Sequence, residues 1–278
     1  MTTVAVTGAS GFVGRYVVAE LARRSLSPVL ISRYGSTTPP AAGIAVQMDV
    51  HDPPADAFDR IGKPDVVIHL AWGGLPNYKS SHHFDRESPA HFQFLKRLLD
   101  SGLRHLVVAG TCYEYGMQSG PLHEDLEARP VTAYGLGKDI LRRLLERSVT
   151  GESSLTWARL FYPYGEGQAA TSLWPQLKRA AERGDPTFDM SPGEQLRDYL
   201  PVEDVARHIV ALALADKGCG VVNICSGQPT SIRALAERWI REQGWSIALN
   251  LGRYPYPDYE PMAFWGNPRK LHRVLGLA

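Results

Sequence analysis

The sequence predicts an α/β fold in which a doubly wound parallel sheet carries a smaller C-terminal α+β lobe. Short, near-continuously apolar β-branched segments alternate with helical patterns over the first 160 residues, and Gly- and Pro-rich stretches then interrupt this rhythm. Strands that are apolar on both sides are typical of a parallel sheet covered by helices on both faces. We expect residues 1–160 to form the first domain, residues 198–220 to return to it, and residues 161–278 to form most of the second lobe.

The elements follow in order along the chain. In the first domain, strands are predicted at 3–6, 28–32, 45–48, 65–71 and 105–110, and helices at 14–24, 92–99 and from residue 134 onward. In the second half, strands are predicted at 155–161 and 221–225, and helices at 204–214 and from residue 231 to residue 239. The remaining segments of the second half read as long loops, and long loops on a rigid sheet commonly form a binding site.

Composition and charge exclude several classes of protein. The chain has 278 residues, of which 44% are hydrophobic, too many for a disordered chain. Thirty basic and 29 acidic residues leave a net charge of +1, which removes the main electrostatic argument for binding nucleic acid or a membrane surface. Three scattered cysteines favour a reducing compartment. With no signal peptide or long apolar run in the sequence, we expect a cytoplasmic protein.

A glycine-rich turn follows the first strand directly. The segment T-G-A-S-G-F-V-G places Gly8, Gly11 and Gly14 at three-residue intervals, and a helix follows at once. Glycines let backbone N–H groups approach a pyrophosphate, and a helix N-terminus adds partial positive charge. The spacing is a variant of the dinucleotide fingerprint and predicts a Rossmann-type fold. Six further residues complete the expected cofactor site: Ser10, Phe12, Val13, Leu70, Ala71 and Trp72.

The end of the second strand indicates which nicotinamide cofactor is bound. A carboxylate there would bind the ribose 2′-hydroxyl of NAD, but this chain has Ser32 and Arg33. A hydroxyl and a guanidinium suit a 2′-phosphate, so the sequence favours NADP, with NAD as the alternative. The competing interpretation is that Arg33 simply faces solvent. Asp49 and Val50, after the third strand, are expected beside the adenine ring.

Three residues form a candidate catalytic group. Tyr134 and Lys138 stand four apart on a predicted helix and therefore share one face. An ammonium group near the phenol is expected to lower the tyrosine pKa and make it a general acid/base. Thr111 follows the fifth strand, where α/β sheets place ligand-binding groups, although its hydroxyl could serve only to cap the strand end.

These motifs together resemble the extended short-chain dehydrogenase/reductase family, and in particular its nucleotide-sugar epimerases, dehydratases and ketoreductases. The resemblance extends from the glycine turn through Y-G-L-G-K (134–138) and R-D-Y-L-P-V-E-D-V-A (197–206) to the segment N-P-R-K-L-H-R-V-L-G-L near the end. It implies that Thr111, Tyr134 and Lys138 are catalytic and that Lys138 also holds the nicotinamide ribose. It further implies a dinucleotide-binding first domain, a substrate-binding second lobe, a nucleotide-sugar substrate and a homodimer.

The resemblance also implies a substrate site. Arg197 would bind the diphosphate of a nucleotide sugar, unless it forms a structural salt bridge with Asp198 or Glu203. Phe188 could stack on the base, or pack in the core. The remaining candidates are Cys112, Tyr113 and Tyr162.

Departures from the family pattern narrow the reaction. Sugar 4,6-dehydratases carry an acidic pair directly after the catalytic threonine, where this chain has Cys112 and Tyr113, so a dehydratase is not expected. The block G-T-C-Y-E-Y-G resembles that of bacterial reductases acting on dTDP-4-keto-6-deoxyhexoses, including those that make dTDP-6-deoxy-talose or dTDP-fucose. Tyr113 would then face the sugar, unless it fills a core position.

We therefore expect an NAD(P)H-dependent 4-ketoreductase for a nucleotide-linked 4-keto-6-deoxy sugar, with an NAD-dependent nucleotide-sugar 4-epimerase as the alternative. A cofactor-sensing regulator would need the glycine turn but not the acid/base group, so retention of Thr111, Tyr134 and Lys138 argues against it. No metal site is expected. His82 and His83, with Asp85 nearby, lack further ligands at suitable spacing and read as a surface loop.

Overall fold

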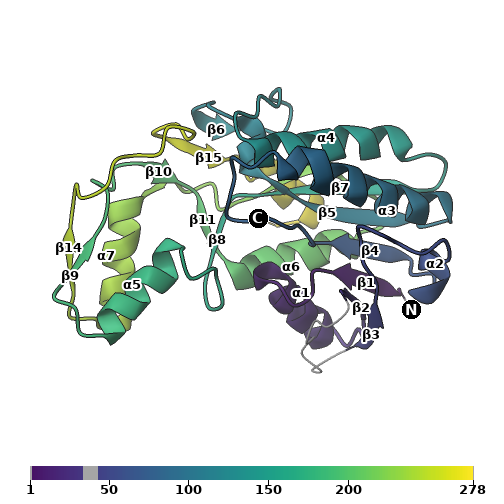
Figure 1. Cartoon of the computed structure of the whole chain (residues 1–278), viewed down its shortest axis with the longest axis horizontal. Helices are drawn as coiled ribbons and strands as arrows, with labels where there is room; N and C mark the ends of the chain where they lie inside the picture. The colour runs from purple at the N-terminus through teal and green to yellow at the C-terminus, as the bar shows by residue number, and fades with distance from the viewer. Residues whose placement is uncertain (1, 34–42, 278) are drawn as a thin grey trace.

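The computed structural model describes residues 2–33 and 43–277. Its centre is a sheet of parallel strands in the order β12-β7-β5-β4-β1-β2-β3 (Figure 1). These strands are β1 (Val4–Thr7), β2 (Val29–Ser32), β3 (Ile44–Gln47), β4 (Val66–His69), β5 (His105–Thr111), β7 (Ser154–Leu160) and β12 (Gly220–Ile224). The predicted α/β class with a parallel sheet is confirmed.

Helices cover both faces of this sheet, as its doubly apolar strands require. One face carries α1 (Phe12–Arg23), α6 (Val202–Ala213) and α8 (Arg269–Leu275), and the other carries α2 (Ala57–Arg60), α3 (Ser88–Asp100) and α4 (Ala133–Ser148). Side chains alternate across β1, so that Val4 and Val6 enter the first core and Ala5 enters the second. Each fully buried leucine, such as Leu21 of α1, contributes about 1.5–3 kcal/mol to stability.

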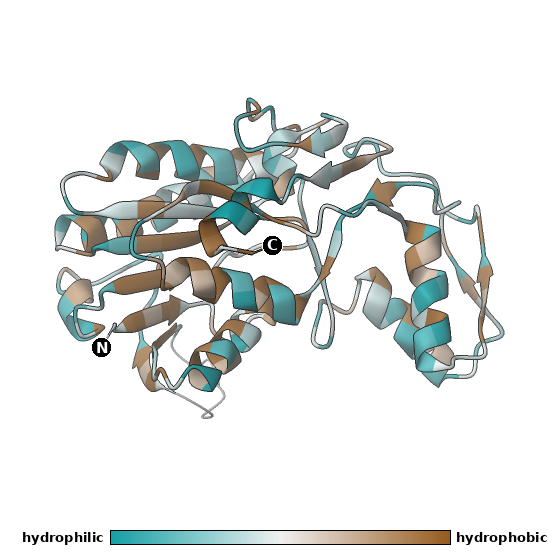
Figure 2. Ribbon diagram, turned by 180° about the vertical axis from the view of Figure 1, so that it is seen from behind, coloured by the Kyte–Doolittle hydropathy of each residue, from teal (hydrophilic) through white to brown (hydrophobic). Residues whose placement is uncertain are grey.

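A smaller lobe with its own core lies beside the sheet (Figure 1). It consists of α5 (Leu173–Glu182), α7 (Ile232–Gln243), β9 (Thr187–Asp189) and β14 (Ala248–Asn250). Leu177 and Trp239 pack together at its centre. Figure 2 shows the apolar colouring on the strands of the sheet and the mixed colouring of the helices around them.

Short ribbons and turns connect the sheet to this lobe. The ribbons pair β10 with β13, β11 with β8, and β15 with β6. Their bounds are β6 (Gly120–Leu122), β8 (Tyr162–Tyr164), β10 (Leu196–Arg197), β11 (Tyr199–Pro201), β13 (Thr230–Ser231) and β15 (Phe264–Gly266). A π-helical turn, η1 (His83–Glu87), precedes α3, and a 3₁₀ turn, η2 (Cys112–Tyr115), follows β5.

The chain crosses back to the sheet after building part of the second lobe. α6 packs against α1, and β12 extends the sheet beside β7. α8 also returns, since Leu271 lies in the core on the α1 face. That last return was not among our expectations, and the domain boundaries themselves stay a prediction.

The helices differ from the sequence expectation in the start of α3 and in three additions, because α2, α5 and α8 were not among the predicted helices. α3 starts at Ser88 rather than at residue 92, because Pro89 falls in its first turn, where a missing N–H costs nothing. α5 was not expected at all, since its flanks are rich in Gly and Pro. None of the helices in the described part of the chain has the length and apolar character needed to cross a bilayer.

The glycine turn yields a stability prediction. A Cβ on Gly14 would stand 2.0 Å from the carbonyl oxygen of Gly8, whereas a Cβ on Gly11 would stand 3.1 Å from the same atom. We expect Gly14→Ala to lower the free energy of unfolding by about 2–3 kcal/mol, because the backbone must move. Gly11→Ala should cost about 1 kcal/mol or less. Denaturant unfolding of both variants measures the difference, and equal midpoints would contradict the close approach.

Candidate functional site

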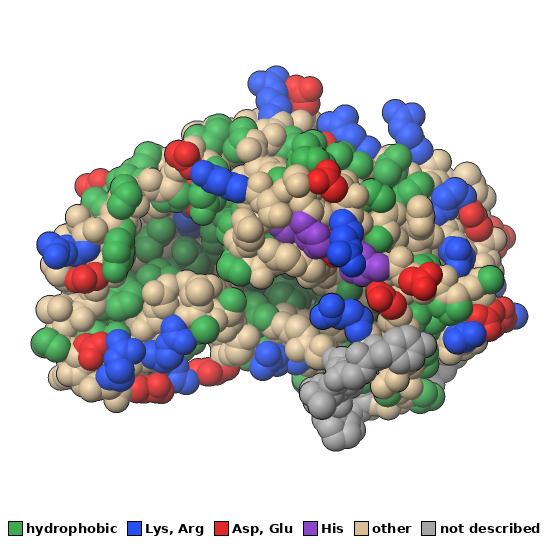
Figure 3. All heavy atoms as spheres, in the orientation of Figure 1, with side chains coloured by type: hydrophobic (Ala, Val, Ile, Leu, Met, Phe, Trp, Pro, Cys, Tyr) green, Lys and Arg blue, Asp and Glu red, His purple; other side chains and the backbone are tan. Residues whose placement is uncertain are grey.

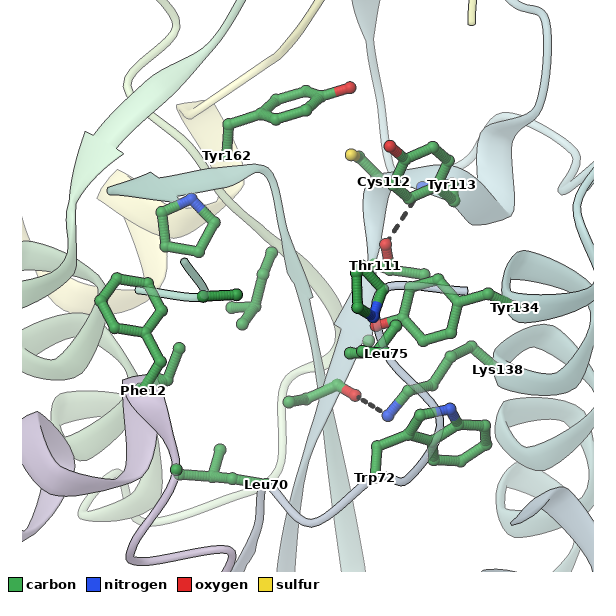
Figure 4. A pocket seen from close by; sticks show the side chains of 18 of the residues that line it. Phe12, Leu70, Trp72, Leu75, Thr111, Cys112, Tyr113, Tyr134, Lys138 and Tyr162 are labelled. Carbon is green, nitrogen blue, oxygen red and sulfur yellow. Dashed lines mark hydrogen bonds between the residues drawn. The ribbon is translucent and has the colours of Figure 1, made fainter. Parts of the chain in front are cut away.

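A cavity of about 410 Å³ opens at the carboxyl ends of β1, β4 and β5, where the second lobe meets the sheet. Figure 3 shows a hollow between the two lobes, bordered largely by hydrophobic side chains. Figure 4 shows how the residues that line the cavity point toward one another from both sides. Ligands of open α/β sheets bind at this edge.

The glycine turn forms one wall of the cavity. Gly8, Gly11, Phe12, Val13 and Gly14 all line it. Gly8 has φ +70°, and a Cβ there would stand 2.7 Å from the backbone nitrogen of Ala71. Gly11 caps α1 without a side-chain hydrogen bond. The first N–H groups of α1 and its positive end are thus available to an anion, as a pyrophosphate site requires.

A second cavity lies on the other side of the glycine turn and shares Gly8, Gly11, Leu70 and Trp72 with the first. The remaining predicted cofactor residues line it: Ser10, Ser32, Arg33, Asp49, Val50 and Ala71. The structure thus brings the predicted cofactor residues together around two adjoining cavities, whose shape and glycine wall fit a dinucleotide.

Thr111, Tyr134 and Lys138 meet in the first cavity (Figure 4). Thr111 ends β5, and Tyr134 stands in the first turn of α4, which Thr132 caps by accepting a hydrogen bond from the Gly135 N–H at 3.0 Å. The Thr111 side chain and the Tyr134 phenol both line this cavity. The Lys138 ammonium donates to the carbonyl oxygen of Ala109 at 2.8 Å and lies 3.9 Å from the centre of the Trp72 ring.

The electrostatics of this group differ from the sequence expectation. Burial raises the pKa of Tyr134 instead of lowering it, and the nearby Thr111 side chain only partly opposes this rise. Burial also lowers the pKa of Lys138 to about 7. The expectation that Lys138 lowers the pKa of the phenol is therefore wrong for the cofactor-free protein. The spacing of residues does not reveal desolvation. The ammonium group is directed at Ala109 and Trp72.

The far wall of the first cavity contains Cys112, Tyr113 and Tyr162. The hydroxyls of both tyrosines donate to the carboxylate of Glu260, and the Tyr162 bond measures 2.9 Å. Tyr113 is also packed against Tyr78, with ring centres 5.0 Å apart. Tyr113 therefore both faces the cavity and packs tightly.

Arg197 and Phe188 lie elsewhere. The Arg197 guanidinium is buried and donates to Glu260 at 2.8 Å, so it forms a structural ion pair with a partner other than Asp198 or Glu203. Asp198 instead accepts hydrogen bonds from Ser226 and Gly227. Phe188 packs in the core of the second lobe. Neither Arg197 nor Phe188 lines the cavity, and their predicted contacts with a nucleotide stay predictions.

Sequence reasoning missed three carboxylates near the site, namely Glu114, Glu260 and Glu87, of which Glu87 lines the second cavity. Glu114 accepts hydrogen bonds from the Thr111 N–H at 2.8 Å and from the Arg159 Nε at 2.7 Å. The pattern Thr-x-x-Glu at 111–114 is a capping-box signature and could have revealed it. Glu260 sits in a long loop near the C-terminus, and no local pattern marks it.

The histidine pair at 82–83 is also placed differently from the expected surface loop. His83 is buried in the π-helical turn and accepts a hydrogen bond from the Trp72 indole at 3.0 Å. His82 contacts the carboxylate of Glu87 at 2.9 Å. Both rings therefore belong to the packed wall beside the cavities.

The lowered pKa of Lys138 predicts how stability depends on pH. Between pH values of about 7 and 10.5, the unfolded chain keeps a proton that the folded protein has lost, so the free energy of unfolding rises with pH. The variant Lys138→Met lacks this titrating group. Its free energy of unfolding should therefore rise less steeply with pH, by up to about 1.4 kcal/mol per pH unit. Denaturant unfolding of the cofactor-free protein across this window measures it. Lys96→Met, which removes an exposed lysine, should keep the wild-type slope, and an unchanged slope in Lys138→Met would refute the buried titration.

Comparison with known proteins gives several relatives along nearly the whole chain. A dTDP-6-deoxy-L-talose 4-dehydrogenase (NAD(+)) of Aggregatibacter actinomycetemcomitans is 29% identical, over 95% of this chain and 98% of its own. A dTDP-6-deoxy-L-talose 4-dehydrogenase (NAD(P)(+)) of Kitasatospora kifunensis is also 29% identical, over 92% of this chain and 83% of its own.

Solved structures agree with the fold. MoeE5 in complex with UDP-glucose and NAD is 28% identical, with a TM-score of 0.81 over 99% of this chain and 92% of its own. A UDP-glucose 4-epimerase of Stenotrophomonas maltophila reaches a TM-score of 0.87 over 99% of this chain and 93% of its own, at 22% identity, and supports the fold alone. The sequence profile of the NAD-dependent epimerase/dehydratase family matches residues 4–225. This match spans most of the chain and agrees with the resemblance seen in the motifs, and the protein therefore belongs to the NAD-dependent epimerase/dehydratase family.

Proposed function

We propose that the protein reduces the 4-keto group of a nucleotide-linked 4-keto-6-deoxy sugar, with Tyr134 as the general acid. One observation carries the proposal: the Tyr134 phenol, the Thr111 hydroxyl and the Lys138 ammonium line the same cavity as a glycine wall suited to a dinucleotide. The bound cofactor would supply the hydride to C4 of the sugar. The carbonyl oxygen takes the phenolic proton of Tyr134 and becomes the C4 hydroxyl, which balances the reaction.

Tyr134 is protonated at neutral pH in the cofactor-free protein, and its raised pKa makes it a weaker acid there than a free phenol. A phenol that stays protonated at neutral pH can donate to a ketone oxygen, and the Thr111 hydroxyl can bind both the phenol and the substrate oxygen. Lys138, four residues further along α4, lines the same cavity and is proposed to hold the nicotinamide ribose. Cys112, Tyr113 and Tyr162 would face the sugar.

The substrate class rests on the relatives. Two of them are named as 4-dehydrogenases of dTDP-6-deoxy-L-talose, which is the proposed reduction written in reverse. MoeE5 was solved with UDP-glucose, so the nucleotide is left to experiment. A nucleotide-sugar 4-epimerase is the second candidate, because a curated UDP-glucose 4-epimerase of Lactobacillus helveticus also matches, at 24% identity over 98% of this chain and 91% of its own. A homodimer and a cytoplasmic location stay predictions from the sequence.

For the cofactor we propose NADPH. Ser32 and Arg33 stand at the end of β2 in the second cavity, where a carboxylate would favour NAD, and the Arg33 side chain is exposed and free to meet a 2′-phosphate. The named relatives use NAD(+) in one case and NAD(P)(+) in another, so NAD is the alternative.

Substitution of the phenol tests the reaction. Tyr134→Phe should lower kcat for NADPH oxidation by a dTDP-4-keto-6-deoxy sugar about 10²–10⁴-fold, because the proton donor is lost. Cofactor binding, followed by fluorescence titration, should survive. Tyr254→Phe, which alters an exposed phenol, is the control. The epimerase would be favoured over the reductase by two findings together: NAD that stays tightly bound to the purified protein, and interconversion of sugar epimers without net NADPH use.

Substitution of the guanidinium tests the cofactor. Arg33→Asp should raise KM for NADPH at least about tenfold and leave KM for NADH unchanged or lower, because a charge-assisted bond to the 2′-phosphate becomes a repulsion. Steady-state kinetics with both cofactors measures the ratio. Equal effects on the two cofactors would show that Arg33 has no part in recognising the 2′-phosphate.

A further inference from the structure

Three imidazoles converge on one buried carboxylate beside the second cavity. The Nε2 atom of His51 lies 2.8 Å from Oε1 of Glu87, and the Nε2 atom of His91 lies 3.0 Å from Oε2. His82 approaches Oε1 with its own Nε2 atom at 2.9 Å. Glu87 and His91 are each 1% exposed, so the convergence is built into the protein interior.

Separate parts of the fold supply these side chains. His51 follows β3, Glu87 closes the π-helical turn η1, and His91 stands one helical turn later in α3. Residues at i and i+4 share one face of a helix, which directs Glu87 and His91 to the same point. Helical turns of the π type are rare and occur often at functional sites.

A second layer of polar groups orients the imidazoles. The Nδ1 atom of His51 lies 3.3 Å from the Asp49 carboxylate, and Nδ1 of His91 lies 2.6 Å from Nε2 of His69. Nδ1 of His69 in turn lies 2.8 Å from the hydroxyl of Thr7. Metal-binding histidines typically have their second nitrogen held in this way.

We propose that His51, Glu87 and His91 bind a divalent transition-metal ion of the zinc class. Two imidazole nitrogens and one carboxylate oxygen are donors that zinc accepts. The ligand atoms of the three residues already lie within 4.8 Å of one another. Ligand atoms each about 2.0–2.2 Å from one ion are at most about 4.4 Å apart, so small side-chain rotations complete the set.

The hydrogen bonds behind the cluster are compatible with replacement of the imidazole–carboxylate hydrogen bonds by bonds to a metal ion. Each Nε2 atom must carry a lone pair toward the ion, so each ring proton must sit on Nδ1. The proton of His51 then points to Asp49, and the proton of His91 points to His69. His69 then accepts at Nε2 and donates from Nδ1 to the Thr7 hydroxyl, which can accept as well as donate. Glu87 neutralises one of the two positive charges of the ion, and the Asp49 carboxylate lies behind His51.

The proposal places a cation in the wall that Ser32 and Arg33 share with the cluster. The ion would therefore stand in the second cavity, separated from Tyr134 by the Trp72 ring, whose centroid lies 4.9 Å from that of His91 and 6.2 Å from that of Tyr134. Its role is to hold β3, η1 and α3 together at this wall. It takes no part in the proposed proton transfer.

Direct metal titration tests the site. Full-length protein with any affinity tag removed is treated with a chelator and titrated with Co²⁺, followed by visible absorption, and with Zn²⁺ against a chromophoric chelator. One equivalent should bind. Glu87→Gln and His91→Gln should each weaken binding by at least about tenfold. His123→Gln, which changes an exposed histidine outside the cluster, should bind as the wild type does.

The outcome does not depend on the proposed function, because neither nucleotide nor sugar is present in the titration. Unsaturable uptake, no uptake, or stoichiometric binding that survives both substitutions would overturn the proposal. Should either buried variant fail to fold, as judged by circular dichroism, His51→Gln on the partly exposed side provides the same measurement. Undiminished binding by that variant would overturn the proposal equally.

Discussion

The carboxylate of Glu114 holds the end of β5, and the geometry of the cavity depends on it. Its Oε1 atom accepts hydrogen bonds from the Thr111 N–H at 2.8 Å and the Trp157 indole at 2.9 Å, and its Oε2 atom accepts from Arg159 at 2.7 Å. These groups are buried, and breaking such an ion pair by removing one partner costs about 3–5 kcal/mol. Gly110 is required beside it, because a Cβ there would stand 2.1 Å from the indole nitrogen.

From this anchor the site extends in both directions along the chain. The Thr111 hydroxyl caps the turn η2, which carries Cys112 and Tyr113 along the cavity wall. The same hydroxyl meets the phenol of Tyr134 from α4, so one residue positions groups from two segments. A buried charge pair therefore acts here as a geometric constraint on the site, whatever its net contribution to stability.

Short sequence patterns predicted the sheet and the glycine wall, because the residues that determine these features are neighbours in the sequence. The sheet follows from near-continuous apolar strands, and the glycine wall follows from three glycines spaced three apart between a strand and a helix. The pairing of Arg197 with Glu260 joins residues far apart in sequence through a loop, and His51 reaches Glu87 from another element, so no spacing rule could find either. The pKa of Tyr134 depends on how much protein covers it, a property of the folded chain.

The four phenols of the cavity wall show why its chemistry is assigned to one of them. Tyr113 and Tyr162 both donate to the Glu260 carboxylate, whose other oxygen is paired with Arg197. An ionised carboxylate can only accept, so these two protons are committed to holding the wall. Tyr134 shares the cavity with the Thr111 hydroxyl, and a hydroxyl can either donate or accept a hydrogen bond. Tyr78 is set apart differently, since its backbone carbonyl fixes the start of α4 by accepting from the Tyr134 N–H at 3.0 Å. The commitment of the Tyr113 and Tyr162 protons to Glu260 therefore supports the proposal that Tyr134 is the proton donor of the cavity.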